Sequence, residues 1–215
     1  SLAYFAVENK TMIDSIIYFY VMVWASRLGI YLFRRVRNDG KDVRFEKAKR
    51  HFFWFLQYWM GQALWVSLTA CAAIIAILSP EDDTLPVLAI FGMALWLSGF
   101  TIESISDYQK RAFRKENNPK ESFIHTGLWA RSRHPNYFGE ITLWTGIAVI
   151  ALNTLTGIEY ITLISPVFVY ILLTRMSGVN LLERIADERY GHLEEYQQYK
   201  RNTPVLVPKL SKDKI

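Results

Sequence analysis

Cationic and hydrogen-bonding side chains gather in the stretch RSRHPNYFGE, which begins at Arg131 and opens an apolar segment. Pro135 suits the first turn of a helix, where its missing N–H group costs nothing, so we expect a helix to begin there. Unpaired N–H groups at a helix amino terminus attract anions, and arginine offers forked donors to phosphate. The sequence therefore predicts an anion site formed by Arg131, Arg133 and His134.

The same stretch carries two polar residues onto one face of the expected helix. Asn136 and Glu140 are four residues apart, so Glu140 lies one turn deeper in the apolar segment. A carboxylate inside a membrane span is costly unless it faces a partner or a wet cavity, which makes Glu140 a functional candidate. The simpler alternative is a basic membrane flank with a capping Asn and a paired Glu. We predict no metal site, because His134 has no second ligand at suitable spacing.

A second polar stripe precedes this stretch along the chain. An arc of roughly 60 degrees on a helix contains Glu103, Asp107, Lys110 and Arg114. The acids lie nearer to the apolar segment and the bases farther out. Such a stripe suits a long ligand whose anionic group meets Lys110, Arg111 and Arg114 while hydroxyl or amide groups meet the acids. The alternative is a solvated stripe in which neighbouring charges steady the helix.

Further polar candidates lie near both ends of the sequence. Arg175 ends the final apolar segment, and Glu183 recurs with other polar residues at helical spacing. That later segment is either a plain membrane-surface helix or a lid over a ligand. In the first apolar segment, Arg27 either extends towards the membrane surface or contacts the anionic groups of the ligand.

The elements that must position these residues are membrane-spanning helices. Hydrophobic residues make up 51% of the 215 and are gathered in blocks, and the block from Phe52 to Leu78 contains no charge. About 20 apolar residues suffice to cross a bilayer as a helix. We predict an all-α integral membrane protein formed by one domain, 1–215, with a cytoplasmic C-terminal helix in the tail 179–215. The five spans are expected at about 13–33, 52–78, 85–106, 136–156 and 159–176.

Loop charges predict the orientation of these spans. The segment from Arg34 to His51 and the tail are rich in Lys and Arg, whereas the connection from Ser79 to Pro86 has neither. Because cytoplasmic loops collect basic residues, we expect a cytoplasmic carboxyl terminus in a bacterial inner membrane or the endoplasmic reticulum. The net charge of +5 then reflects topology and contact with membrane lipids rather than nucleic acid. The single cysteine, Cys71, excludes an intrachain disulfide.

Four passages resemble the membrane-embedded steroid 5-alpha-reductase family, including its short bacterial DUF1295-type branch. They are SDYQKRAFR, GLWARSRHPNYFGE, NLLERIADERYG with YKRNTPVLVP, and more weakly WASRLGIYLFRR. Sterol C14 and C7 reductases are more distantly similar. Most of the specificity comes from RHPNYFGE with the upstream QKxxFR pattern. Isoprenylcysteine carboxyl methyltransferases share a shorter RHPxY pattern and a similar tail, and are the competing resemblance.

This resemblance implies an NADPH-dependent reductase of a conjugated C=C bond in a lipid or 3-oxo-4-ene steroid that enters from the bilayer. It implies Tyr137 and Glu140 as catalytic candidates, with Glu140 near the carboxamide of NADPH. The cofactor-binding residues that it implies are Glu103, Asp107, Lys110, Arg111, Arg114, Arg133, His134, Asn136, Arg175 and Glu183.

The first span departs from the family pattern. Steroid reductases use a Tyr and a carboxylate to bond the substrate carbonyl, but Trp24 stands where that Tyr is expected. We expect the carboxylate in a segment before Ser1, or another donor in its place. The available phenols are Tyr18, Tyr20, Tyr31 and Tyr58. Two alternatives to the reductase stay open: an S-adenosylmethionine-dependent membrane methyltransferase and a non-catalytic lipid-binding membrane protein.

Overall fold

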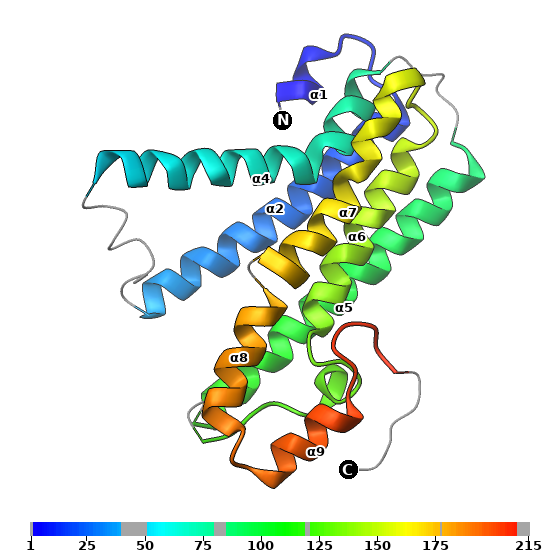
Figure 1. Ribbon diagram of the computed structural model, residues 1–215. Coiled ribbons are helices and arrows are strands. Elements are labelled where there is room, and N and C mark those ends of the chain that lie inside the picture. Colours follow the sequence, from blue (N-terminus) through cyan, green and yellow to red (C-terminus); the bar gives the residue numbers. More distant parts are fainter. Residues whose placement is uncertain (1, 40–50, 80–84, 119–120, 177, 210–215) are drawn as a thin grey trace. The chain divides into compact units, whose positions relative to one another are not determined.

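The computed structural model describes residues 2–39, 51–79, 85–118, 121–176 and 178–209 (Figure 1). Within these ranges the chain forms helices and loops and no β-strand. The all-α class predicted from the apolar blocks is confirmed. Most of the basic loop before His51, most of the acidic loop after Ser79 and the end of the tail at 210–215 lie outside the described residues.

Among the described residues, four helical segments are long and apolar enough to cross a membrane. They are Met12–Arg34, Phe52–Leu78, Val87–Glu116 and Gly157–Tyr190, and they overlap four of the five expected spans. The remaining expected span, 136–156, corresponds to α6 (Pro135–Ala151), whose 17 residues lie at the short end of bilayer-spanning helices. The count of five spans and the cytoplasmic position of the tail stay predictions.

The chain folds as two compact units, and the first comprises Ser1–Phe91 and Ile147–Ser165. Its helices are α1 (Leu2–Ala6), α2 (Met12–Asp39), α4 (Phe52–Leu78) and the 3-10 helix η2 (Gly157–Leu163). Helix α4 packs against α1, α2 and η2. Cys71 contributes to the last of these contacts, because its thiol donates to the Thr162 carbonyl oxygen at 3.2 Å.

The first unit also contains the residues considered for the substrate carbonyl. Trp24, Tyr18, Tyr20 and Tyr31 lie on α2, as does Arg27, and Tyr58 lies on α4. The side chain of Tyr20 is buried. Roles for these residues towards a substrate or a cofactor stay predictions.

The second unit comprises Gly92–Gly146 and Pro166–Ile215 and contains all the predicted catalytic and cofactor-binding residues. It begins within α5 (Val87–Glu116) and continues through the short helix η1 (Gly127–Ala130) into α6. After α7 (Ile164–Ile171) comes a π-helical turn, η3 (Leu172–Met176). Helices α8 (Val179–Tyr190) and α9 (Glu194–Asn202) follow (Figure 1).

Helices α5 and α6 approach each other closely at glycines. A Cβ atom on Gly139 of α6 would lie 2.6 Å from the backbone nitrogen of Glu103 on α5, and one on Gly99 would lie 2.5 Å from that of Leu143. Only glycine permits backbones this close. Because Gly139 precedes Glu140, the contact holds the buried Glu103 beside the turn that carries Glu140.

We expect Gly139→Ala to lower the stability of the fold, because its methyl group would push two helix backbones apart. Overpacking of this kind costs about 1–3 kcal/mol, measurable as a lower melting temperature in detergent. Gly61→Ala in α4 is the matched control, since a Cβ there meets nothing within 4 Å and alanine favours a helix interior. Equal melting temperatures for Gly139→Ala and the wild type would contradict the close approach.

Candidate functional site

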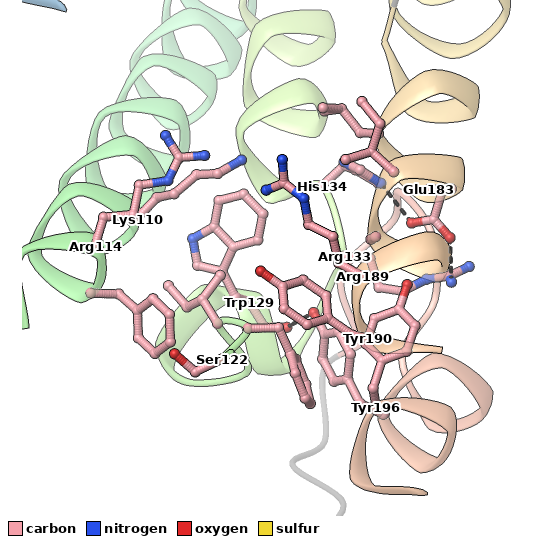
Figure 2. Close-up of a pocket in the computed structure, with 17 residues that line it drawn as sticks. Lys110, Arg114, Ser122, Trp129, Arg133, His134, Glu183, Arg189, Tyr190 and Tyr196 are labelled. Carbon is pink, nitrogen blue, oxygen red and sulfur yellow. Dashed lines mark hydrogen bonds and ion pairs between the residues drawn. The ribbon is translucent and has the colours of Figure 1, made fainter. Parts of the chain in front are cut away.

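A cavity of about 190 Å³ lies within the second unit (Figure 2). Its walls come from α5, the loop Ser122–Ile124, Trp129 of η1, the two residues before Pro135, and the helices α8 and α9. Segments far apart in sequence therefore meet around one space. Five of the predicted binding residues line this cavity: Lys110, Arg114, Arg133, His134 and Glu183.

The other predicted residues do not line this cavity among the described parts of the chain. Glu103 is buried on α5, Asp107 is half-buried, and Arg111 is exposed with its Nε donating to the Asp107 carbonyl oxygen at 3.4 Å. Arg175 is exposed on the π-helical turn. The remaining three are half-buried on the first turns of α6: Asn136, Tyr137 and Glu140.

Glu183 is the carboxylate at the centre of an ion network. Arg133 Nη1 donates to its Oε2 at 2.6 Å, and His134 Nε2 lies 2.9 Å from its Oε1. Their side chains are only 11% and 7% exposed, so these interactions are shielded from water. The role of Glu183 as a cofactor contact stays a prediction; in the structure this carboxylate fixes Arg133 and His134 at the cavity wall.

Helix α9 is joined to α8 by a second set of charged contacts. Lys200 Nζ donates to both carboxylate oxygens of Asp187, at 2.6 and 2.7 Å. The Tyr196 hydroxyl donates to the same carboxylate at 3.1 Å. Burial, followed by the nearby Asp187 charge, raises the pKa of Tyr196 above its ordinary range. Tyr196 therefore stays a neutral donor at physiological pH.

Aromatic side chains form another wall of the cavity. The Phe123 ring centroid lies 5.8 Å from that of Tyr190, 5.2 Å from that of Tyr196 and 5.4 Å from that of Tyr199. The Tyr199 hydroxyl donates to the Trp129 carbonyl oxygen at 2.7 Å. Burial raises the pKa of Tyr199, so this hydroxyl also stays protonated. Flat apolar faces beside cations suit an anionic ligand with an aromatic ring.

Lys110 joins the aromatic wall to the cationic part of the cavity. Its Nζ lies 4.6 Å from the Trp129 ring centroid, within the range of a cation–π interaction. The Trp129 indole N–H in turn donates to the Ser106 carbonyl oxygen at 3.1 Å, which fixes the ring against α5. The Lys110 ammonium group therefore lies over the face of the Trp129 ring.

The residues after α9 form a strap along the segment before α6. The Arg133 N–H donates to the Pro204 carbonyl oxygen at 2.9 Å and the His134 N–H to that of Val205 at 3.1 Å. The Ser132 hydroxyl donates to the Leu206 carbonyl oxygen at 2.7 Å. Two backbone donors expected to be open to an anion are thus already bonded. Attraction of an anion to this segment rests on the side chains.

The first turn of α6, which follows His134 in the sequence, carries Asn136 and Tyr137. The Tyr137 ring stacks on the His134 ring, with centroids 5.6 Å apart and an interplanar angle of 9°. Asn136 Oδ1 is buried and has no hydrogen-bond partner among the described residues. A buried acceptor without a donor is costly, so this amide indicates a position for a polar ligand group.

Sequence reasoning did not assign Arg189, Tyr190 or Phe123 to the site. Tyr190 follows Glu183 by seven residues, which is two helical turns, and so continues the Glu183 face of α8. That spacing was a usable signal for Tyr190, whereas Arg189, six residues after Glu183, does not share this face. Phe123 lies in a loop without periodicity, and only the fold brings it against the tyrosines of α8 and α9.

The chain matches a family model described as "Protein of unknown function (DUF1295)" over residues 1–203. The chain belongs to the DUF1295 family. This DUF1295 chain is also similar to the mouse and rat proteins named 3-oxo-5-alpha-steroid 4-dehydrogenase 1. Each is 30% identical over 117 residues, covering 54% of this chain and 40% of the relative.

The human protein of that name is 25% identical over 119 residues, covering 55% of this chain and 40% of the relative. The matched part of the DUF1295 chain thus spans about two fifths of the length of these curated relatives. No solved structure matches it. The family resemblance predicted from the motifs is confirmed.

Proposed function

We propose that this protein is an integral membrane oxidoreductase that uses NADPH to reduce a conjugated C=C bond in a lipid or 3-oxo-4-ene steroid. The observation that carries the proposal is the cationic and aromatic cavity, in a chain similar to 3-oxo-5-alpha-steroid 4-dehydrogenases. The four apolar helices support a substrate that enters from the bilayer. In this proposal the carboxyl-terminal helices face the cytoplasm, where NADPH is available.

The side chains present fit such a cofactor. Lys110 and Arg114 offer cationic donors to phosphate groups, and the aromatic wall offers flat faces to a purine ring. The buried Asn136 Oδ1 matches the N–H₂ donors of a carboxamide. When bound, NADPH supplies the hydride that reduces the C=C bond.

In this proposal the residues of the site bind NADPH and fix its orientation. Glu183 holds Arg133 and His134 in place through the contacts at 2.6 and 2.9 Å. The stack between His134 and Tyr137 then limits the rotation of the Tyr137 ring. Glu140, one turn farther along α6, is proposed to accept a hydrogen bond from the carboxamide and so to fix the reactive ring.

The substrate carbonyl needs a hydrogen-bond donor, because negative charge develops on its oxygen as the hydride adds to the conjugated carbon. The sequence offers four phenols as candidates for this donor, Tyr18, Tyr20, Tyr31 and Tyr58. Tyr20 is the buried one among these four, and its replacement with phenylalanine is the first test.

Ligand-induced stabilisation in detergent tests the class of cofactor. A ligand at 100 times its dissociation constant stabilises the native state by about 2.7 kcal/mol, so we expect NADPH to raise the melting temperature. S-adenosylmethionine should leave it unchanged, because the cavity is lined by cationic side chains and this ligand carries no phosphate group. Stabilisation by S-adenosylmethionine alone would rule out the reductase in favour of a methyltransferase.

A further inference from the structure

Two arginines of the cavity have no carboxylate partner among the described residues. Arg114 lies on α5 and Arg189 on α8, and both line the cavity (Figure 2). Glu183, the carboxylate that lines the same cavity, already accepts the hydrogen bond from Arg133 and contacts His134. The cavity therefore presents two guanidinium groups that form no ion pair with a carboxylate in the described part of the chain.

Two guanidinium groups favour an anion with a charge near two. A phosphate monoester carries about −1.5 to −2 at neutral pH, whereas each phosphate of a dinucleotide bridge carries a single charge. The planar fork of arginine also matches two phosphate oxygens at once, which an ammonium group does not. A monoester group is thus the better fit to Arg114 and Arg189.

The aromatic side chains of the cavity indicate the kind of molecule to which this phosphate is attached. Phe123, Tyr190 and Tyr196 line the cavity together with the two arginines, and their rings lie within 5.2 to 5.8 Å of one another. Such faces accept a flat heteroaromatic ring by stacking. The raised pKa of Tyr196 keeps this phenol neutral, so it adds no negative charge beside the phosphate. A purine nucleoside with a phosphate monoester combines both features.

We propose that Arg189, together with Arg114, binds the 2′-phosphate at the adenosine end of NADPH and makes the site prefer NADPH to NADH. This inference rests on the proposed function. Dinucleotide sites that select NADH bond the ribose 2′-hydroxyl with a carboxylate, but Glu183 is held by Arg133 and His134. Arg189 thus becomes a residue that determines cofactor specificity.

Calorimetric titration of the full chain in detergent tests this assignment through binding alone. The probes are adenosine 2′,5′-bisphosphate, which carries the 2′-phosphate, and ADP-ribose, whose two phosphates form a bridge and include no monoester. We expect Arg189→Gln to weaken binding of the bisphosphate about 10- to 100-fold, as for loss of a charge-assisted hydrogen bond. Binding of ADP-ribose should change less than about threefold, because it offers Arg189 no monoester phosphate. The ratio of NADPH to NADH affinity should fall together with bisphosphate affinity.

Arg184→Gln is the matched control for lost charge. Arg184 lies on the same helix with a side chain that is 71% exposed, and its Nε lies 4.0 Å from Glu188 Oε1. It does not line the cavity formed by the described residues, so both affinities should stay at wild-type values. Arg189→Lys keeps the charge and is expected to retain more bisphosphate affinity than Arg189→Gln.

Each other outcome has a definite consequence. If Arg189→Gln keeps the wild-type preference for the bisphosphate, the assignment of Arg189 is overturned while the reductase proposal stands. If the wild type binds NADPH and NADH equally, recognition of the 2′-phosphate is overturned and a dinucleotide reductase remains. If the wild type binds neither dinucleotide, this inference and the proposed function are both overturned.

Discussion

Glu183→Ala is expected to cause a large loss of stability, because Arg133 and His134 would lose the acceptor they share. Removal of one partner of a buried ion pair costs about 3–5 kcal/mol. The Glu183 side chain is 19% exposed, which places the expected loss at about 3 kcal/mol, near the lower end of that range. Thermal unfolding in detergent without ligand measures it directly.

A second carboxylate of the same helix provides the control. Glu188 is 69% exposed and lies 4.0 Å from Arg184, and an exposed pair of this kind contributes less than about 1 kcal/mol. Glu188→Ala should therefore unfold close to the wild-type temperature. Similar melting temperatures for Glu183→Ala and Glu188→Ala would show that the network around Glu183 does not hold the cavity wall.

The same substitution should also weaken NADPH binding. Arg133 and His134 would be free to move away from the cavity wall once Glu183 no longer fixes them. Glu183→Gln separates the effect of the hydrogen bond from that of the charge, because its amide retains a hydrogen-bond acceptor but has no negative charge. We expect it to be more stable than Glu183→Ala and to bind NADPH with an affinity between those of the wild type and Glu183→Ala.

Glu140→Gln is expected to have the largest effect on turnover. In the proposed site this carboxylate fixes the reactive end of NADPH, and loss of a group that acts in the transition state lowers kcat about 10²- to 10³-fold. The measurement is NADPH oxidation with progesterone, a 3-oxo-4-ene steroid, as substrate. The KM for NADPH should rise much less than kcat falls, because the cationic cavity residues remain.

Glu116→Gln is the matched control for this substitution, since Glu116 is exposed at the end of α5. It removes the same charge without touching α6 and should keep wild-type turnover. The melting temperature of Glu140→Gln shows whether the variant is folded. Turnover at the wild-type rate in a folded Glu140→Gln would remove Glu140 from the catalytic site.

The sequence predicted those parts of the fold that local patterns encode. Helix α6 begins at Pro135, as its position before an apolar run indicated, and α4 extends from Phe52 to Leu78 along the uncharged block. The polar stripe of α5 places Lys110 and Arg114 at the cavity. Each of these features depends on residues within a few turns of one another.

The parts that sequence reasoning missed depend on contacts between distant segments. No periodicity links Arg133 to Glu183, which follows it by 50 positions, or Phe123 to the tyrosines of α9. Side-chain patterns do not indicate which backbone carbonyl groups accept hydrogen bonds. Those of Pro204 and Val205 accept them from the N–H groups just before α6. Backbone hydrogen bonds of this kind arise from tertiary structure and cannot be inferred from residue types.

The strap after α9 has a consequence for the order in which the protein is made. Apolar helices can enter the membrane one after another as the ribosome extends the chain. The segment before α6, however, receives its acceptor for Ser132 from Leu206, 74 positions later. Until that strap leaves the ribosome, the Arg133 N–H lacks its Pro204 acceptor, and the His134 N–H has only the Ser132 hydroxyl oxygen of its two acceptors. Formation of helix α6 and completion of the cationic cavity are therefore separate events during synthesis, and the cavity is completed second.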